Sequence, residues 1–144
     1  GSVRGSSDLY EEASRSGRAQ VKNGAQVIDV CLANPDRDEM ADTERFMGHV
    51  IRKVKAPLMI DSTDPAVIER ALTYSQGKAI INSINLEDGD ERFEKVVPMA
   101  RRFGAAFIVG CIDEQGMAVT AERKLEVELR SRDLPPHRAG GRAP

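Results

Sequence analysis

The chain has 144 residues, of which 40% are hydrophobic and 31% are charged, and its net charge is −2. This composition is typical of one folded globular domain and excludes an intrinsically disordered chain. The nearly balanced charge supplies no basic field for nucleic acid, and no apolar run approaches the ~20 residues that span a bilayer. Because no leader sequence is recognisable at the start, we expect a cytoplasmic protein with neither nucleic acid nor a membrane as its partner.

Amphipathic stretches predict five helices. The first is weakened by Ser14 and Gly17, which have low helix propensity. Pro98 is expected to kink the fourth because it removes an interior hydrogen bond, and Leu125 and Leu129 are expected to face inward on the fifth. The expected helices run from Asp8 to about Asn23, from about Asp38 to Lys53, from Pro65 to before Gly77, from about Phe93 to before Gly104, and from about Thr120 onward.

Four short apolar runs alternate with these helices and predict strands that begin near residues 26, 57, 79 and 105. The runs are almost continuously apolar, which is typical of parallel strands buried on both faces. This order predicts an α/β fold with about four strand–helix units. A complete (βα)8 barrel uses ~250 residues. The chain is therefore either a small open α/β sheet or about half of a barrel, and spacing alone does not distinguish the two.

The cysteines and histidines do not suggest a metal site. Cys31 and Cys111 each lie in an apolar run without a second thiol nearby, which predicts buried free thiols rather than a disulfide or a metal centre. His49 and His137 have no partner at ligand spacing. We therefore expect no bound metal.

A compact polar group follows each apolar run. In a parallel α/β sheet the carboxyl ends of the strands meet at one rim, where ligands bind. The alternative for each single group is that it caps the next helix or begins a turn. The groups are Asn34-Pro35-Asp36, Asp61-Ser62-Thr63, Asn82-Ser83 with Asn85, and Asp113-Glu114.

Asp61 and Asn82 are one strand–helix–strand step apart and should be neighbours at this rim. An ionised carboxylate accepts two parallel hydrogen bonds from an amidine-like edge, while a carboxamide both donates and accepts. With no Lys or Arg expected at the rim, the pair suits a neutral planar heterocycle rather than an anion. The residues alone do not name the molecule.

Three segments carry a resemblance to a known family: VKNGAQVIDV (21–30), LMIDST (58–63) and GKAIINSIN (77–85), with further matches at 105–108 and 113–116. From about residue 10 to residue 130 the chain resembles the pterin-binding barrel of the methyltetrahydrofolate:corrinoid methyltransferases, the methionine synthase type. The most specific part is the pair of segments that places Asp61 and Asn82 21 positions apart. The resemblance implies part of a (βα)8 TIM barrel, like that of dihydropteroate synthase.

The resemblance also implies roles for single residues. Asp61 would bind the 2-amino and N3 edge of the pterin ring, with Asn82 beside it. No catalytic residue is assigned. Further residues that would line the site are Asn34, Ser62, Ser83, Asn85 and Asp113.

In this family the N5-methyl group of methyltetrahydrofolate passes to a reduced corrinoid. The expected substrate is thus a tetrahydrofolate derivative. Cobalamin is expected only on a separate partner domain or protein, since no Asp-x-His-x-x-Gly motif occurs in the chain. The difficult step is the departure of an amine, whose nitrogen must be protonated or hydrogen-bonded as the bond to the methyl group breaks.

The chain also departs from the family pattern, which has one strand before the first helix and three more after the fifth. We therefore expect a tag or disordered segment at 1–7, a truncated barrel at 8–130 and an irregular tail at 131–144. Methyl transfer by such an isolated piece is expected to be absent or impaired. Open sheet edges favour self-association, so a homodimer or a higher oligomer is expected.

Two alternatives remain open at this point. One is a folded half-barrel that binds no ligand and self-associates. The other is an enzyme like dihydropteroate synthase, which ranks lower because a pyrophosphate leaving group requires basic groups and none is expected at the rim.

Overall fold

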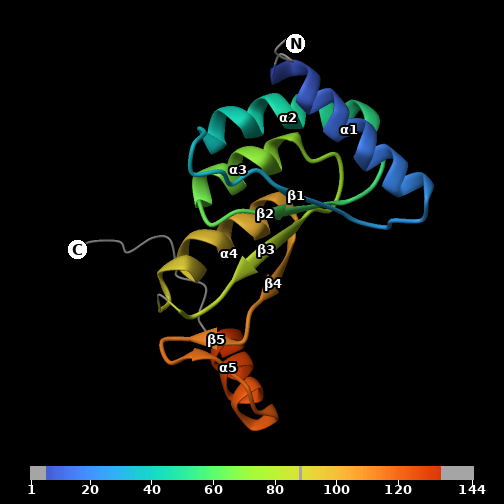
Figure 1. Cartoon of the computed structure of the whole chain (residues 1–144). Coiled ribbons are helices and arrows are strands. Elements are labelled where there is room, and N and C mark those ends of the chain that lie inside the picture. Colours follow the sequence, from blue (N-terminus) through green and yellow to red (C-terminus); the bar gives the residue numbers. More distant parts are fainter. Residues whose placement is uncertain (1–5, 88, 134–144) are drawn as a thin grey trace.

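The computed structural model describes residues 6–87 and 89–133 (Figure 1). Helices and strands alternate along this part of the chain, which confirms the predicted α/β class. A short hairpin before the last helix is an addition that the apolar pattern did not predict. The elements are α1 (Ser6–Lys22), β1 (Ile28–Cys31), α2 (Glu39–Lys53), β2 (Leu58–Asp61), α3 (Pro65–Tyr74), β3 (Ile80–Ile84), α4 (Glu91–Phe103), β4 (Ala106–Val109), β5 (Ile112–Asp113), β6 (Gly116–Met117) and α5 (Ala121–Asp133).

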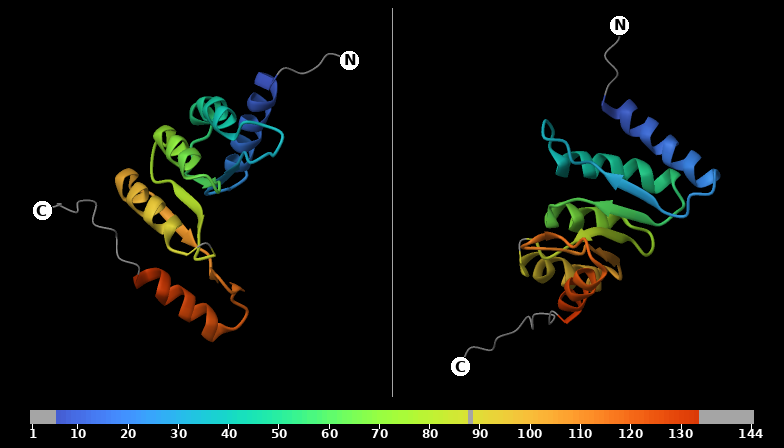
Figure 2. Two further views of the ribbon diagram at one scale, coloured as in Figure 1. Left: turned by 90° about the vertical axis from the view of Figure 1, so that its left-hand side faces the viewer. Right: turned by 60° about the horizontal axis from the view of Figure 1, so that its bottom comes forward.

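β1 to β4 form one parallel sheet in the order β1-β2-β3-β4, and β5 pairs with β6 in a separate antiparallel hairpin. Helices α2, α3 and α4 follow one another along one side of the parallel sheet (Figure 2, left). Strands paired in chain order, with their helices along one side, are the arrangement of consecutive units in a (βα)8 barrel. A doubly wound sheet would instead reverse its strand order and carry helices on both faces. The fold is therefore that of a partial barrel with four units.

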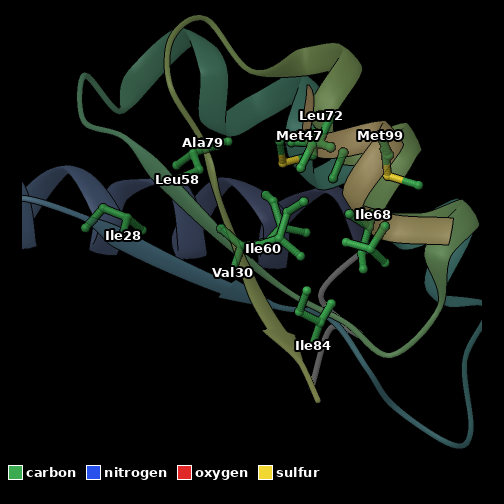
Figure 3. Close-up of a cluster of buried hydrophobic side chains, with 14 of the residues drawn as sticks. Ile28, Val30, Met47, Leu58, Ile60, Ile68, Leu72, Ala79, Ile84 and Met99 are labelled. Carbon is green, nitrogen blue, oxygen red and sulfur yellow. The ribbon is translucent and has the colours of Figure 1, made fainter. Parts of the chain in front are cut away.

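The core lies between the sheet and its helices (Figure 3). Alternate strand residues, such as Val30 and Ile60, are buried there together with helix residues such as Met47 and Ile68. The remaining strand residues point to the other side of the sheet, which we call the inner face. The inner face carries Asp29, Cys31, Met59, Asp61, Ile80 and Asn82.

The inner face is more exposed than the helix face, so the prediction of strands buried on both faces is wrong for the described chain. The reason is that no described element covers the inner face. Cys31 is exposed for this reason, and Cys111 is half-buried, so the prediction of two buried thiols is also wrong.

The residues that weakened the prediction of α1 contribute to its packing. The buried Ser14 hydroxyl donates to the carbonyl of Tyr10, one turn earlier, at 2.7 Å. Gly17 is buried where a Cβ atom would lie 3.1 Å from Cγ2 of Val54. Glycine therefore allows α1 to approach the segment between α2 and β2 closely.

The sequence made one prediction about each of the last two helices, a kink at Pro98 in α4 and an inward face on α5. α4 is continuous through Pro98, which lies on its exposed side. On α5, Leu125 and Leu129 are 54% and 43% exposed, whereas Val127 is 1% exposed. The predicted inward face of α5 is therefore wrong, because the helix packs through Val127 and no described helix covers its leucines.

Helical structure extends slightly past the expected limits of 8 and 130, since α1 begins at Ser6 and α5 ends at Asp133. Most of the expected tag and tail, at 1–5 and 134–144, lies outside the described residues. None of the helices in the described part of the chain combines the length and apolar character that crossing a bilayer requires.

Candidate functional site

Asp61, the last residue of β2, is directly in register with Asn82, which lies in the middle of β3, and theirs is the last pair between the two strands. Cys31 of β1 is in register with Asp61 on its other side. Residues in register on neighbouring parallel strands project to the same side of a sheet. The carboxylate and the carboxamide therefore both lie on the inner face, at the rim where ligands bind in α/β barrels.

Both side chains are half-buried, and among residues 6–87 and 89–133 neither has a recorded hydrogen-bond or ion-pair partner. Asp61 does not cap α3. That cap is Asp64, whose carboxylate accepts from the backbone N–H of Ala66 at 2.8 Å. The Asp61 carboxylate and the Asn82 carboxamide are thus available to a ligand.

Three of the expected lining residues form local turns instead. The side-chain oxygens of these residues each accept a hydrogen bond from a backbone N–H two positions later, which is the capping alternative considered from sequence. The bonds are Asn34 from Asp36 at 2.9 Å, Ser62 from Asp64 at 3.1 Å, and Asn85 from Glu87 at 3.0 Å.

Asp113 lies apart from the parallel sheet, in the β5–β6 hairpin. It is buried, its carboxylate accepts from the N–H of Gln115 at 3.0 Å, and it also forms an ion pair with Arg123. Its carboxylate is therefore engaged within the chain. Ser83 directly follows Asn82 and has a half-buried side chain.

The chain was also compared with known proteins. The model of a family described as pterin binding enzyme matches residues 2–140. The chain belongs to the pterin-binding enzyme family. This confirms the resemblance carried by the Asp61 and Asn82 segments.

Two curated relatives of the chain carry the name methionine synthase. The protein of Mycobacterium tuberculosis (strain ATCC 25618 / H37Rv) is 35% identical over 124 residues, which cover 84% of this chain and 10% of the relative. The protein of Mycobacterium leprae (strain TN) is 36% identical over 124 residues, with the same two coverages of 84% and 10%. The chain thus spans about a tenth of the length of the curated relatives that it matches.

Arg92 is a residue of the candidate site that the sequence analysis missed. From the first turn of α4 its guanidinium donates to three backbone carbonyls, those of Ser62 at 2.9 Å, Thr63 at 2.5 Å and Ser83 at 3.1 Å. The expectation of no basic residue at the rim is therefore wrong. One signal was present: a cation in the first turn of a helix opposes the helix dipole and needs another reason to be there.

A second cluster holds the loop that follows β1. Arg37 donates to the Asp42 carboxylate and, at 2.6 Å, to the Tyr10 hydroxyl, which itself donates to Asp42. Hydrogen bonds from Arg37 and Tyr10 lower the pKa of Asp42 to about 2, although its burial acts in the opposite direction. The cluster connects α1, α2 and the loop that carries Asn34.

Among the described residues, no group of three or more His, Cys, Asp or Glu side chains could hold a metal ion. One groove lies at the other end of the sheet, where Lys55, Pro57, Gly77 and Lys78 line the amino ends of β2 and β3. Because ligands of α/β barrels bind at the carboxyl ends of the strands, the Asp61 and Asn82 pair is the better candidate.

Proposed function

We propose that the chain binds the pterin ring of methyltetrahydrofolate through Asp61 and Asn82. The observation that carries the proposal is the register of these two residues, with both side chains free of partners among the described residues. Neighbouring strands lie about 4.8 Å apart, so one planar ring can meet both groups at once. The carboxylate would accept from the 2-amino group and N3–H, and the carboxamide would bind the adjacent ring edge.

The wider activity proposed for the chain is part of a methyl transfer from N5 of methyltetrahydrofolate to a corrinoid. The corrinoid would be held on another domain or protein, since nothing in this sequence supplies its motif. The contribution of this chain is to hold and orient the pterin. No described residue is assigned to protonate the departing nitrogen, and transfer by the chain alone is expected to be impaired.

Calorimetric titration with methyltetrahydrofolate tests the binding proposal. Loss of a hydrogen bond to a charged group costs about 1.5–3 kcal/mol, so Asp61→Asn should bind about ten- to a hundredfold more weakly than the parent. Asp29→Asn is the matched control, because Asp29 lies on the same inner face but nearer the amino ends of the strands. Equal affinity of Asp61→Asn and the parent would remove the role of Asp61.

The alternative of an enzyme like dihydropteroate synthase gains little from the arginine at the rim. Arg92 donates all three recorded hydrogen bonds to backbone carbonyls. Three of its five N–H donors are therefore engaged by the backbone, which makes it poorly suited to hold a pyrophosphate leaving group.

We also propose that the chain by itself forms a homodimer through its sheet edges. β1 and β4 each have one unpaired edge within the described sheet, and apolar side chains are exposed there: Val27 and Phe107 at 36% and Ile108 at 41%. A twofold axis along the barrel axis brings β1 of one copy beside β4 of the other with all strands parallel. The two seams would be identical and would leave no open edge.

Light scattering tests the dimer. The parent is expected at twice the monomer mass of 15.8 kDa. Ile108→Lys on the β4 edge should shift it towards the monomer, whereas Thr73→Lys on the exposed side of α3 should not. A parent that scatters as a monomer at micromolar concentration would contradict the proposal and also the self-associating alternative.

A further inference from the structure

We infer that Arg92 is a positioning residue that sets the spacing between Asp61 and Asn82. The inference rests on the proposed function of that pair. Arg92 itself touches neither side chain in any recorded contact; it acts on the backbone that carries them.

Arg92 contacts the residues that directly follow Asp61 and Asn82. Ser62 directly follows Asp61, and Ser83 directly follows Asn82. Arg92 Nη2 donates to the carbonyl of Ser62 at 2.9 Å, and Nε donates to the carbonyl of Ser83 at 3.1 Å. A single side chain of α4 therefore connects the backbone just after β2 to the backbone of β3, and we call these contacts the Arg92 bridge.

The bridge lies just beyond the last paired residues of β2 and β3, next to an irregularity in the pairing of β3 with β4. The register of β2 with β3 ends at the Asp61–Asn82 pair, and the register of β3 with β4 shifts between Ile81 and Ile84. Among the described residues, no recorded hydrogen bond other than those of Arg92 joins the segment after Asp61 to the segment after Asn82. Without the bridge, nothing recorded in the described chain would tie the backbone just after Asp61 to the backbone just after Asn82.

Arginine fits this task because of its shape. Its planar guanidinium presents donors in a fixed fork, so it can bond to carbonyls on two strands and hold them at a set separation. A lysine ammonium carries charge but has no such fixed geometry. Binding of a rigid planar ligand that contacts both Asp61 and Asn82 depends on the distance between the two strands.

Removal of the bridge should leave α4 folded. The helix is anchored by several buried apolar residues, among them Phe93, at 6% exposure, and Val96, at 0%. Arg92 is only half-buried, so water can reach its carbonyl partners when the guanidinium is lost. Variants at position 92 are therefore suitable for binding measurements.

The test compares Arg92→Met, Arg92→Lys and the control Arg101→Met by titration with methyltetrahydrofolate and with 6-methylpterin, which lacks the benzoylglutamate tail. Arg101 is an exposed arginine in the last turn of the same helix. Both substitutions of Arg92 should weaken both ligands about tenfold or more, the size typical for residues that orient a ligand-binding side chain. Arg101→Met should bind like the parent.

A double-mutant cycle separates positioning from a general structural role. If Arg92 acts by positioning Asp61 and Asn82, the loss of ligand affinity caused by Arg92→Met should be largely absent in the Asp61→Asn background. A merely structural role would give the same loss in both backgrounds. Amide hydrogen exchange of the unliganded protein should also rise at residues 62–64 and 83–85 in Arg92→Met and not in Arg101→Met.

The outcomes are distinguishable. If the parent binds both pterins and Arg92→Met binds them equally well, the inference is overturned while the proposed function stands. If the parent binds neither ligand, the proposed function fails and the inference falls with it. Additive losses in the double-mutant cycle would also overturn the positioning role.

Discussion

The Asp42 carboxylate of α2 accepts a hydrogen bond from the Tyr10 hydroxyl of α1, 32 positions earlier in the chain. Both residues are buried, and Arg37 donates to both of them at 2.6 Å. This contact fastens the first helix to the barrel at the rim. It gives α1 a polar anchor in addition to its apolar packing.

The Asp42 cluster predicts acid sensitivity. The folded-state pKa of Asp42 is about 2, below its ordinary value of 3.8. Its contribution to stability is therefore fully present above about pH 4 and is lost as the pH falls towards 2. Urea unfolding between pH 7 and 2 should show this loss in the parent and a smaller pH dependence in Asp42→Asn.

The comparison needs a second carboxylate as control. Arg130 likewise lowers the pKa of the exposed Glu114 to about 2. Glu114→Gln should therefore remove any part of the acid-induced loss of stability that comes from the Glu114–Arg130 pair. Asp42→Asn with the same pH dependence as the parent would refute the role of the cluster.

The close approach at Gly17 predicts a stability loss when a large side chain is added. A Cβ atom there would lie 3.1 Å from Cγ2 of Val54, so Gly17→Leu should reduce the free energy of unfolding by about 1–3 kcal/mol through overpacking. Thermal or urea unfolding measures the change. Val54→Ala, which makes room, should reduce the penalty of Gly17→Leu; a purely additive double variant would contradict the contact.

The exposure of Cys31 provides a probe of the proposed site. Cys31 is exposed on the inner face in register with Asp61, whereas Cys111 is half-buried. A thiol reagent should therefore modify Cys31 faster than Cys111, and saturating methyltetrahydrofolate should slow only Cys31. The variant Cys31→Ser assigns the fast phase. A rate for Cys31 that is unchanged by ligand would count against a pterin on this part of the inner face.

Much of the fold could be predicted because its signals are local. The apolar spacing of α2 and α3 is encoded within a few residues, and the structure has both helices where they were expected, capped by Asp38 and Asp64. The pairing of the segments around Asp61 and Asn82 could also be predicted. One strand–helix–strand step separates them, and parallel pairing follows from that order.

Other features could not be predicted from local patterns. The face that α5 buries depends on which element lies beside it, so an apolar stripe containing Leu125 did not reveal that Val127 is the buried residue. Whether Asn34, Ser62 and Asn85 line a site or close a turn depends on backbone geometry, and in the structure their side-chain oxygens serve turns.

The sequence alone determined the alternation of helices and strands, the family and the two candidate pterin-binding side chains, because each of these is written in short segments. Only the tertiary structure decided that Arg92 reaches the backbone beyond both side chains, across 30 positions to Ser62. That contact exists because folding brings the start of α4 against the ends of β2 and β3, and no spacing along the chain records which residues will meet there.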